Sequence, residues 1–404
     1  MSWPLVKLET VSEFIRNGAS IKQSNDAAGL PITRIETIAD RTVNLDKCGY
    51  ADLSEGEYLN YRLRNGDILI SHINSEKHLA KCAIFESDRG DIVHGMNLLC
   101  LRPSCEVVFP KYLFHYLSSP VFLRLIPAIT KKSVNQASFT VTAFKDLEIP
   151  LPPLPEQKRI AAILDKADAI RRKRQQAIQL ADDFLRAVFL DMFGDPVTNP
   201  KNWEIKSLAS ITEDWRGGAS IKPDDFTDSG FPVLHKGAIR QHGKIVLDES
   251  KKTFVSNEFA EAKKSSLVGR GCVAITLRDL VPSGPSIGLM ADLSDYETDA
   301  YLLSQGAYGF SVKPEELHAG YLVALSNHDG FRQEFKKISV GSTQIHIRSS
   351  DLKELALPVP PVELQRKYSA IRRAVINFQK KAALAEEQGE LFDSLSQKAF
   401  RGEL

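Results

Sequence analysis

The chain consists of two similar halves, and this internal duplication constrains its fold more than any other feature of the sequence. Residues 18–22 and 218–222 are both GASIK, and Trp3 recurs as Trp203 at the same distance before them. The proline-rich residues 149–154 and 357–362, IPLPPL and LPVPPV, also match, and a long helical pattern follows each copy. A repeat of this period indicates that each half is a globular domain followed by a hinge and a helix.

Two long amphipathic helices are predicted after the hinges. Beyond Pro155, apolar residues recur at three- and four-residue steps over residues 160–188, and Gly194 stops the pattern. This run covers about 38 residues, or about 55–60 Å of helix. A second run of equivalent length extends from about residue 363 to residue 400. Because one apolar stripe of this length cannot be buried alone, we expect the two helices to pack on each other as a coiled coil.

The rest of each half predicts a mixed α/β (α+β) domain. Residues 66–70 and 273–276 are short β-forming runs bounded by Gly and Asn or other turn residues, whereas residues 111–117 and 320–325 predict short helices at matching places. A chain of 404 residues with 43% hydrophobic content suffices for two such cores. The halves are therefore expected to be related by a pseudo-twofold internal repeat. The predicted boundaries are a first domain at 1–150, a helix at 151–195, a second domain at 196–357 and a helix at 358–404.

The composition constrains the expected cellular compartment and the way in which the chain could contact nucleic acid. The chain has 52 Lys and Arg against 51 Asp and Glu, so any contact with nucleic acid must be local or shared with partners. Its five cysteines form no CxxC pair, which argues against a zinc ribbon and favours a reducing compartment. Since no apolar run approaches the roughly 18 residues of a membrane span, we expect a soluble, cytoplasmic protein without a membrane partner.

The sequence contains no recognisable catalytic motif. Residues 199–202, NPKN, are nearest to the base-clamping loop of an amino methyltransferase but lack its second proline and its aromatic ring. Residues 269–274 enter a predicted strand instead of leaving one, unlike a dinucleotide fingerprint, and residues 237–244 miss the spacing of a phosphate-binding loop. We therefore predict no catalytic residue, no metal site and no cofactor, although a site of scattered residues would escape a motif search.

The borders of the repeats carry a family resemblance. Residues 151–160, LPPLPEQKRI, open the first helix, residues 192–203 follow its end, and residues 397–404, QKAFRGEL, close the chain. These segments resemble the conserved spacer regions of type I restriction–modification specificity subunits, and the similarity in layout covers the whole chain. One departure is ELQ at residues 363–365, where the first spacer has PEQ. The resemblance implies two target recognition domains that each read half of a split, asymmetric target in double-stranded DNA. It also implies that the two helices are antiparallel and act as a ruler between the domains.

The resemblance also implies partners. Two modification (methyltransferase) subunits would supply the methyl-donor site and methylate adenine N6, and restriction (helicase–nuclease) subunits would translocate and cleave DNA. The chain itself would be non-catalytic. The alternatives are a DNA-recognition scaffold of a related phage-defence system and, ranked lower, a self-contained enzyme with scattered site residues.

Three pairs of loops at corresponding points of the halves are predicted to contact DNA, because polar side chains on exposed loops match base edges and phosphates. The first pair carries Lys22 and Lys222. The second pair consists of His72, Asn74 and Lys77 in one half and of Thr276, Arg278 and Ser283 in the other. The third pair, which the sequence favours most, consists of Lys131, Lys132, Asn135 and Gln136 and of Thr343, Gln344, His346 and Arg348.

Overall fold

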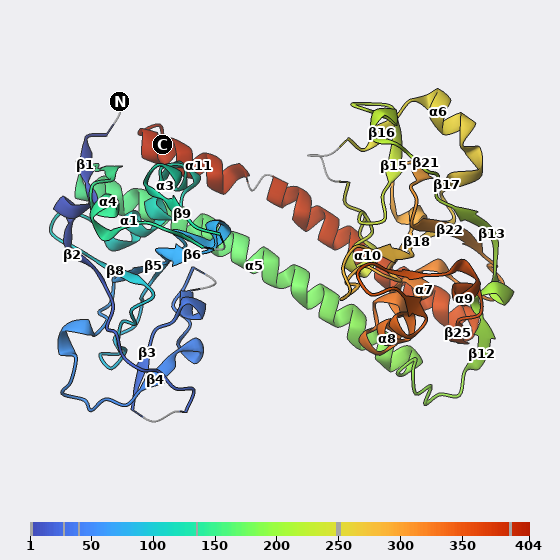
Figure 1. The fold of residues 1–404 in the computed structure, drawn as a ribbon, viewed down its shortest axis with the longest axis horizontal. Helices are drawn as coiled ribbons and strands as arrows, with labels where there is room; N and C mark the ends of the chain where they lie inside the picture. The colour runs from blue at the N-terminus through green and yellow to red at the C-terminus, as the bar shows by residue number, and fades with distance from the viewer. Residues whose placement is uncertain (1–2, 27–28, 39–40, 135, 248–251, 388–389) are drawn as a thin grey trace. The chain divides into compact units, whose positions relative to one another are not determined.

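The computed structural model describes residues 3–26, 29–38, 41–134, 136–247, 252–387 and 390–404. The chain divides into two compact units (Figure 1): Met1–Arg174 with Leu384–Leu404 form the first, and Gln175–Ala383 form the second. Each unit combines one α/β domain with part of the helical segments. The predicted α/β (α+β) class is therefore confirmed. The borders between the units fall inside the long helices and not at the predicted domain boundaries. Those four boundaries therefore stay a prediction.

The first unit is built on a four-stranded antiparallel sheet. Its order is β2-β8-β5-β7, from β2 (Ser12–Asn17) and β8 (Leu99–Pro103) to β5 (Ile68–Ile70) and β7 (Cys82–Ile84). The strands at its centre are short and buried on both faces, and apart from Arg102 of β8 they are apolar, so they lack alternating polarity. A second, two-stranded sheet pairs β3 (Leu30–Ile32) with β4 (Gly49–Ala51). The unit's helices are α1 (Pro110–Leu117), α2 (Pro120–Leu123), α3 (Ile126–Ile129) and α4 (Val141–Lys145).

The second unit repeats this sheet and adds a larger one. The repeated sheet has the order β13-β22-β18-β20, formed by Thr212–Gly217, Ala307–Val312, Cys272–Thr276 and Met290–Asp292. The added sheet has the order β14-β16-β15-β21-β17, formed by Phe226–Thr227, Phe254–Val255, Phe231–Leu234, Ala300–Leu303 and Leu267–Gly269. The helices are α6 (Asn257–Ala262), α7 (Ala319–Asn327), α8 (Asp329–Lys337) and α9 (Ser349–Lys353). The halves thus share a central sheet and differ around it.

The proline-rich hinges have the same structure in both units. β1 (Leu5–Lys7) pairs with β11 (Glu148–Pro150), and β12 (Glu204–Ser207) pairs with β25 (Ala356–Val359). The buried Tyr112 hydroxyl donates to the Pro150 carbonyl, and the Tyr321 hydroxyl donates to the Pro358 carbonyl, each at 2.7 Å. Matching tyrosines therefore fix each domain to the strand that leads into its helix.

The first long helix agrees with the sequence pattern. α5 (Leu154–Phe193) has 40 residues and begins beside Pro155, whose missing N–H is tolerated in a first helical turn. It ends before Gly194, which has φ 76°, a backbone conformation that glycine adopts without strain. The Trp203 indole then donates to the Phe193 carbonyl at 2.8 Å. The repeated tryptophan therefore satisfies a carbonyl at the helix end.

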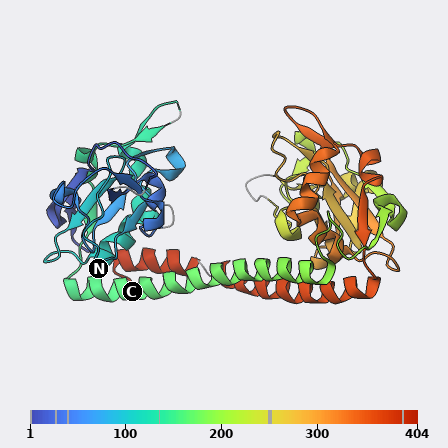
Figure 2. The ribbon, with the colours of Figure 1, turned by 90° about the horizontal axis from the view of Figure 1, so that it is seen from below.

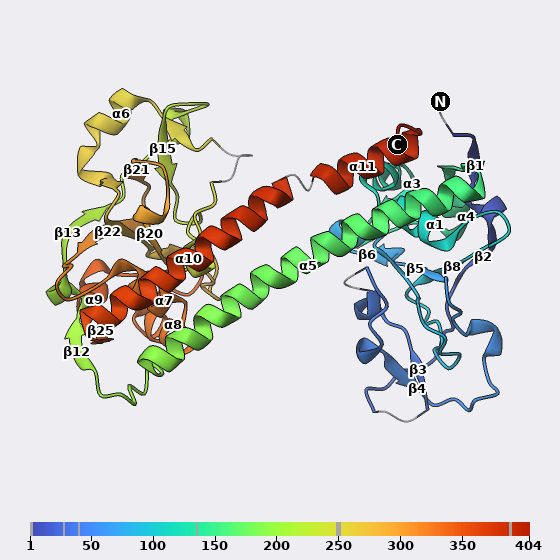
Figure 3. The same ribbon diagram turned by 180° about the vertical axis from the view of Figure 1, so that it is seen from behind.

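The second helical run is described as α10 (Val362–Glu387) and α11 (Glu390–Arg401), and residues 388–389 lie outside the described ranges. In the second unit, Tyr368 of α10 packs on Phe189 of α5 at 5.6 Å, and the Gln379 amide donates to the Ile178 carbonyl at 3.2 Å. Later residues of α10 thus meet earlier residues of α5, so these helices are antiparallel, as Figures 2 and 3 show. The predicted antiparallel pairing is confirmed here.

In the first unit, α11 joins the main core. Phe400 packs edge-on against Tyr112 of α1 at 5.7 Å, and both belong to the cluster that contains Ile160 and Leu164 of α5. The Arg159 guanidinium donates to the Leu404 carbonyl at 3.1 Å. The end of the chain is therefore held by the start of the first long helix.

Candidate nucleic-acid interface

A small three-stranded sheet in the first unit brings two of the predicted loops together. Its order is β6-β10-β9, formed by Ile73–Asn74, Ala137–Ser138 and Lys131–Lys132. Ala137 lies opposite Asn74 on one side and opposite Lys132 on the other. The second and third loops of this half, which are distant in sequence, therefore form one surface.

The second unit contains the corresponding sheet. Its order is β19-β24-β23, formed by Arg278–Asp279, Ile345–Ile347 and Ser339–Val340. His346 lies opposite Arg278 and opposite Val340. In each small sheet, two strands form a hairpin that projects from the domain (Figure 2). These strands are β9 and β10 at residues 131–138 and β23 and β24 at residues 339–347.

The described residues at the hairpin tips are exposed. Val134 is 98% exposed, and Gln136 beside it is also on the surface, whereas Asn135 lies outside the described residues. In the second hairpin, Thr343 and Gln344 are exposed. Amide and hydroxyl groups at such a tip are available to base edges, because they have both donors and acceptors.

Lysines surround the first hairpin. Lys77 and Lys131 are exposed, and the Lys132 ammonium forms an ion pair with Glu76 at 2.6 Å. Both partners of this pair are 63% exposed, so the pair contributes little to stability and is readily exchanged for another anion.

Several predicted positions lie inside the domains. Thr276 is fully buried in β18, and its hydroxyl donates to the Lys236 carbonyl at 2.8 Å. His72 is 5% exposed and packs edge-on against Phe139, and burial lowers its pKa. The half-buried Asn74 donates to the Ser71 hydroxyl at 3.1 Å. These side chains support the loops from within.

The remaining predicted positions lie at or near the surface. Lys22 and Lys222 follow the repeated glycines, and neither lies in a small sheet. A Cβ on Gly18 would collide with the backbone of Gly95, and the repeat partner Gly218 is equally close to Ser304. Close backbone approach therefore explains why both GASIK segments begin with glycine. Ser283 lies in the loop after β19, and Arg348 directly precedes α9.

A groove of about 1020 Å³ in the second unit adds residues that sequence analysis missed. Lys236, Arg240 and Lys244 line it together with Arg278. The first three belong to the segment KGAIRQHGK, which the sequence suggested only as an imperfect phosphate-binding loop. The three cations and two glycines of this segment are the sequence features that could have identified it as a candidate site. The groove is therefore more basic than the composition of the whole chain indicates.

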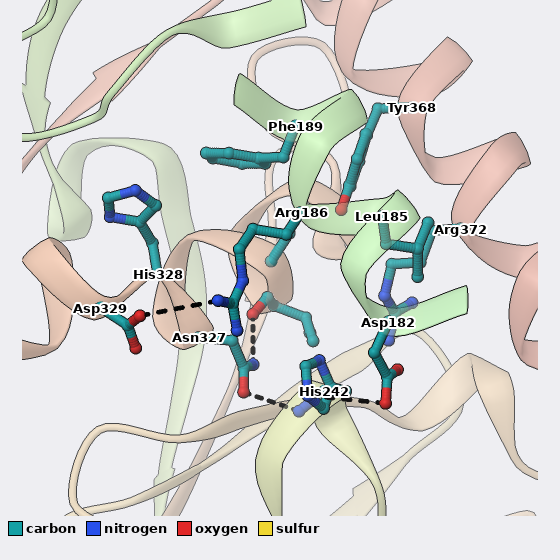
Figure 4. Close-up of a pocket in the computed structure, with 12 residues that line it drawn as sticks. Asp182, Leu185, Arg186, Phe189, His242, Asn327, His328, Asp329, Tyr368 and Arg372 are labelled. Carbon is teal, nitrogen blue, oxygen red and sulfur yellow. Dashed lines mark hydrogen bonds and ion pairs between the residues drawn. The ribbon is translucent and has the colours of Figure 1, made fainter. Parts of the chain in front are cut away.

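A smaller cavity of about 80 Å³ lies where α5, α7 and α10 meet the loop that carries His242 (Figure 4). The His242 backbone N–H donates to the Asn327 side chain at 2.7 Å, and its ring lies 3.9 Å from the Asp182 carboxylate. Burial lowers the pKa of His242 although Asp182 opposes the shift. These contacts hold a loop of the domain against the helices.

A comparison with known protein families identifies the family of the two repeated domains. A family model described as the type I restriction modification DNA specificity domain matches residues 2–180 and again residues 200–386. The chain belongs to this family. The predicted resemblance is therefore confirmed, and the two matches follow the duplication.

Curated members of the family match parts of the chain. The putative type I restriction enzyme MjaX specificity subunit of Methanocaldococcus jannaschii is 40% identical over 214 residues, which cover 53% of this chain and 50% of that protein. The MjaVIII specificity subunit of the same organism is 24% identical over 247 residues, covering 58% and 56%. The matched region thus spans about half the length of these relatives. The StySPI specificity subunit of Salmonella potsdam is 22% identical over 84% of this chain and 74% of its own length.

Solved structures support the fold. The crystal structure of the type I restriction–modification S subunit from M. genitalium has a TM-score of 0.61 and covers 99% of this chain and 96% of its own. A second structure, from a study of complex assembly and conformational transition of the type I R-M system, has a TM-score of 0.50 with coverage of 100% and 98%. Identities of 14% and 18% make these likenesses evidence of fold alone.

Within the described residues there is neither a cluster of metal ligands nor a helix that could span a membrane. Across them, His, Cys, Asp and Glu do not gather in groups of three or more that would hold a metal ion. Within the same ranges, every helix is too short or too polar to span a membrane.

Proposed function

We propose that the chain is the non-catalytic DNA-recognition subunit of a type I restriction–modification complex. It reads a bipartite, asymmetric target through its two domains and directs adenine methylation or cleavage by partner subunits. The observation that carries this proposal is the occurrence, in both units, of a three-stranded sheet with an exposed polar hairpin at residues 131–138 and 339–347. A two-stranded ribbon fits the major groove of B-DNA, about 12 Å wide, where all four base pairs are distinguishable.

The exposed side chains suit two kinds of DNA contact. Gln136 and Gln344 have the paired donor and acceptor that match an adenine edge, and Lys131 supplies charge for a backbone phosphate. The tips differ, since Thr343 precedes Gln344 in one hairpin and Val134 lies near Gln136 in the other. We infer that the two domains read different half-sites. The proposed DNA contacts also include Lys22, Lys77, Lys132, Asn135, Lys222, Arg278, Ser283, His346 and Arg348.

Family membership supports a proposal about partners. In this proposal, two modification subunits bind the chain and supply the methyl-donor site, restriction subunits complete the nuclease, and the complex acts in the cytoplasm without a cofactor bound by this chain. The curated relatives are named specificity subunits, so a scaffold of a different defence system is not favoured.

Methylome sequencing tests the proposal directly. We expect N6-methyladenine at one split, asymmetric motif when the chain is co-expressed with its modification partner, and loss of that motif when the gene is deleted. Purified chain alone is expected to transfer no label from a radioactive methyl donor to DNA. Persistence of the motif without the gene, or methyl transfer by the chain alone, would contradict the proposal.

A further inference from the structure

The basic groove of the second unit contains two cations held side by side. Gly306, with φ +95°, lies between them: a Cβ there would be 3.0 Å from Cβ of Arg278 and 3.3 Å from Cδ of Lys236. The Thr276 hydroxyl donates to the Lys236 carbonyl at 2.8 Å, and the Leu277 N–H donates to the Gly306 carbonyl at 2.8 Å. These backbone hydrogen bonds therefore hold the side chains of Lys236 and Arg278 against Gly306.

The charges of this pair are only partly compensated, by the single neighbouring carboxylate of Asp279. Burial, and then the charge of Arg278, lower the pKa of Lys236. Throughout the described ranges, no carboxylate forms an ion pair with either side chain. The neighbouring Asp279 is occupied, since its carboxylate accepts from the Ser286 N–H at 2.8 Å and from the Ser286 hydroxyl at 2.6 Å. Two half-buried cations near one carboxylate keep a net positive charge and repel each other, and a bound anion would relieve this repulsion.

The position of the pair indicates the kind of anion. Arg278 lies in β19, directly opposite His346 of the second hairpin. The groove of about 1020 Å³ is far larger than a free phosphate ion requires, and it is open to the surface beside the exposed Gln305. An anion that belongs to a long polymer and also reaches the hairpin fits both observations.

We propose that Lys236 and Arg278 clamp a single backbone phosphate of DNA in the groove of the second unit, next to the base edges that its hairpin reads. This inference rests on the proposed function and adds Lys236 to the residues that position DNA. At the corresponding strand position of the first unit, Ile73 lies opposite Ser138 where the second unit has Arg278 opposite His346. The clamp is therefore specific to one half-site.

The salt dependence of DNA binding tests the clamp. The full chain, alone and with its modification partner, is titrated with a labelled duplex of about 30 base pairs between about 50 and 200 mM salt. Each phosphate neutralised contributes about 0.9 to the slope of log Kobs against log salt. If both cations bind one phosphate, the double variant Lys236→Gln/Arg278→Gln loses about 0.9 of slope, and each single variant loses less.

The outcomes separate the clamp from its alternatives. A loss of about 1.8 in the double variant would mean two separate phosphates, and an unchanged slope would mean no phosphate contact; either result overturns the clamp and leaves the proposed function intact. Absence of salt-dependent binding by the unaltered chain and its complex would overturn both. Saturable binding of inorganic phosphate that the variants abolish, with an unchanged DNA slope, would mark a free-anion site and also overturn the clamp.

A matched control excludes general effects. Lys264→Gln removes an exposed charge outside the groove. It is expected to keep the slope of the unaltered chain. Circular dichroism melting curves of all variants must coincide, because the comparison requires folded protein.

Discussion

At the scale of single residues, the tips of the hairpins carry the predicted specificity. We expect Thr343→Ala/Gln344→Ala to relax recognition at one half of the methylated motif and to weaken binding by about 1–3 kcal/mol for each base that the variant no longer reads. Methylome sequencing of cells that express the variant measures this effect. The control is Ser350→Ala in α9, where the exposed Ser350 hydroxyl donates to the Asp351 carboxylate at 3.1 Å. Equal changes in both half-sites would contradict independent reading.

A buried histidine gives the first unit a pH-dependent stability. His94 is 1% exposed and its ring contacts the Leu98 carbonyl at 2.8 Å, and burial lowers its pKa to about 4. The unfolded chain binds a proton below about pH 6.5 whereas the folded chain does not, so stability decreases as pH falls. We expect His94 to account for a decrease of about 1–2 kcal/mol between about pH 6.5 and about pH 5.

Chemical denaturation at the two pH values measures this contribution. The variant His94→Gln keeps an amide donor for Leu98 but does not titrate in this range. Its stability should fall less on acidification than that of the unaltered chain. An equal fall in both proteins would show that His94 is not the titrating group.

The sequence predicted which loops carry candidate residues more reliably than which side chains face outward. Lys131, Gln136 and Gln344 are exposed because they lie in hairpins. Thr276 lies inside because β18 is buried on both faces, so alternation along the strand gives no outward position. Lys236 was missed since only the folded chain brings it beside Arg278.

At the scale of elements, one polar contact fixes the register of the helix pair in the second unit. The Gln379 amide, 6% exposed, donates to the Ile178 carbonyl at 3.2 Å and to the Asp182 carboxylate at 2.8 Å. We expect Gln379→Leu to destabilise the protein by about 1–3 kcal/mol, because the half-buried Asp182 carboxylate then loses this donor.

Thermal and denaturant unfolding measure this cost. Gln179→Leu is the matched control, because Gln179 lies on α5 with an exposed side chain that donates to the Asp183 carboxylate at 3.3 Å. The control should unfold within about 0.5 kcal/mol of the unaltered chain. If Gln379→Leu were as stable as the control, the polar contact would not fix the register.

The two long helices were predicted well, since three- and four-residue spacing over many turns has no other common explanation. The small sheets were not predicted, because pairing of β19 with β24 depends on contacts between segments distant in sequence. Short strands of two or three residues carry too little periodicity to specify their partners.

At the scale of the whole molecule, duplication predicts the domains but not their differences. The repeated anchors identify two halves, whereas the five-stranded sheet of the second unit has only the pair of β3 and β4 as its counterpart among the described strands of the first. The proposed reading of different half-sites accounts for this divergence, because residues that touch only DNA need not match between the halves. The hinges must match if they serve identical partners.

That requirement gives a prediction about assembly. The Gln157 amide donates to the Pro152 carbonyl at 2.8 Å, and Gln365 repeats this contact with Pro360 at 2.7 Å. Because the two junctions of hinge and helix have the same structure, we expect each to recruit one modification subunit through equivalent surfaces. Light scattering or native mass spectrometry of the purified complex should give two modification subunits for one chain at saturation. A plateau at one subunit under a large excess of partner would show that the repeated junctions are not equivalent binding surfaces.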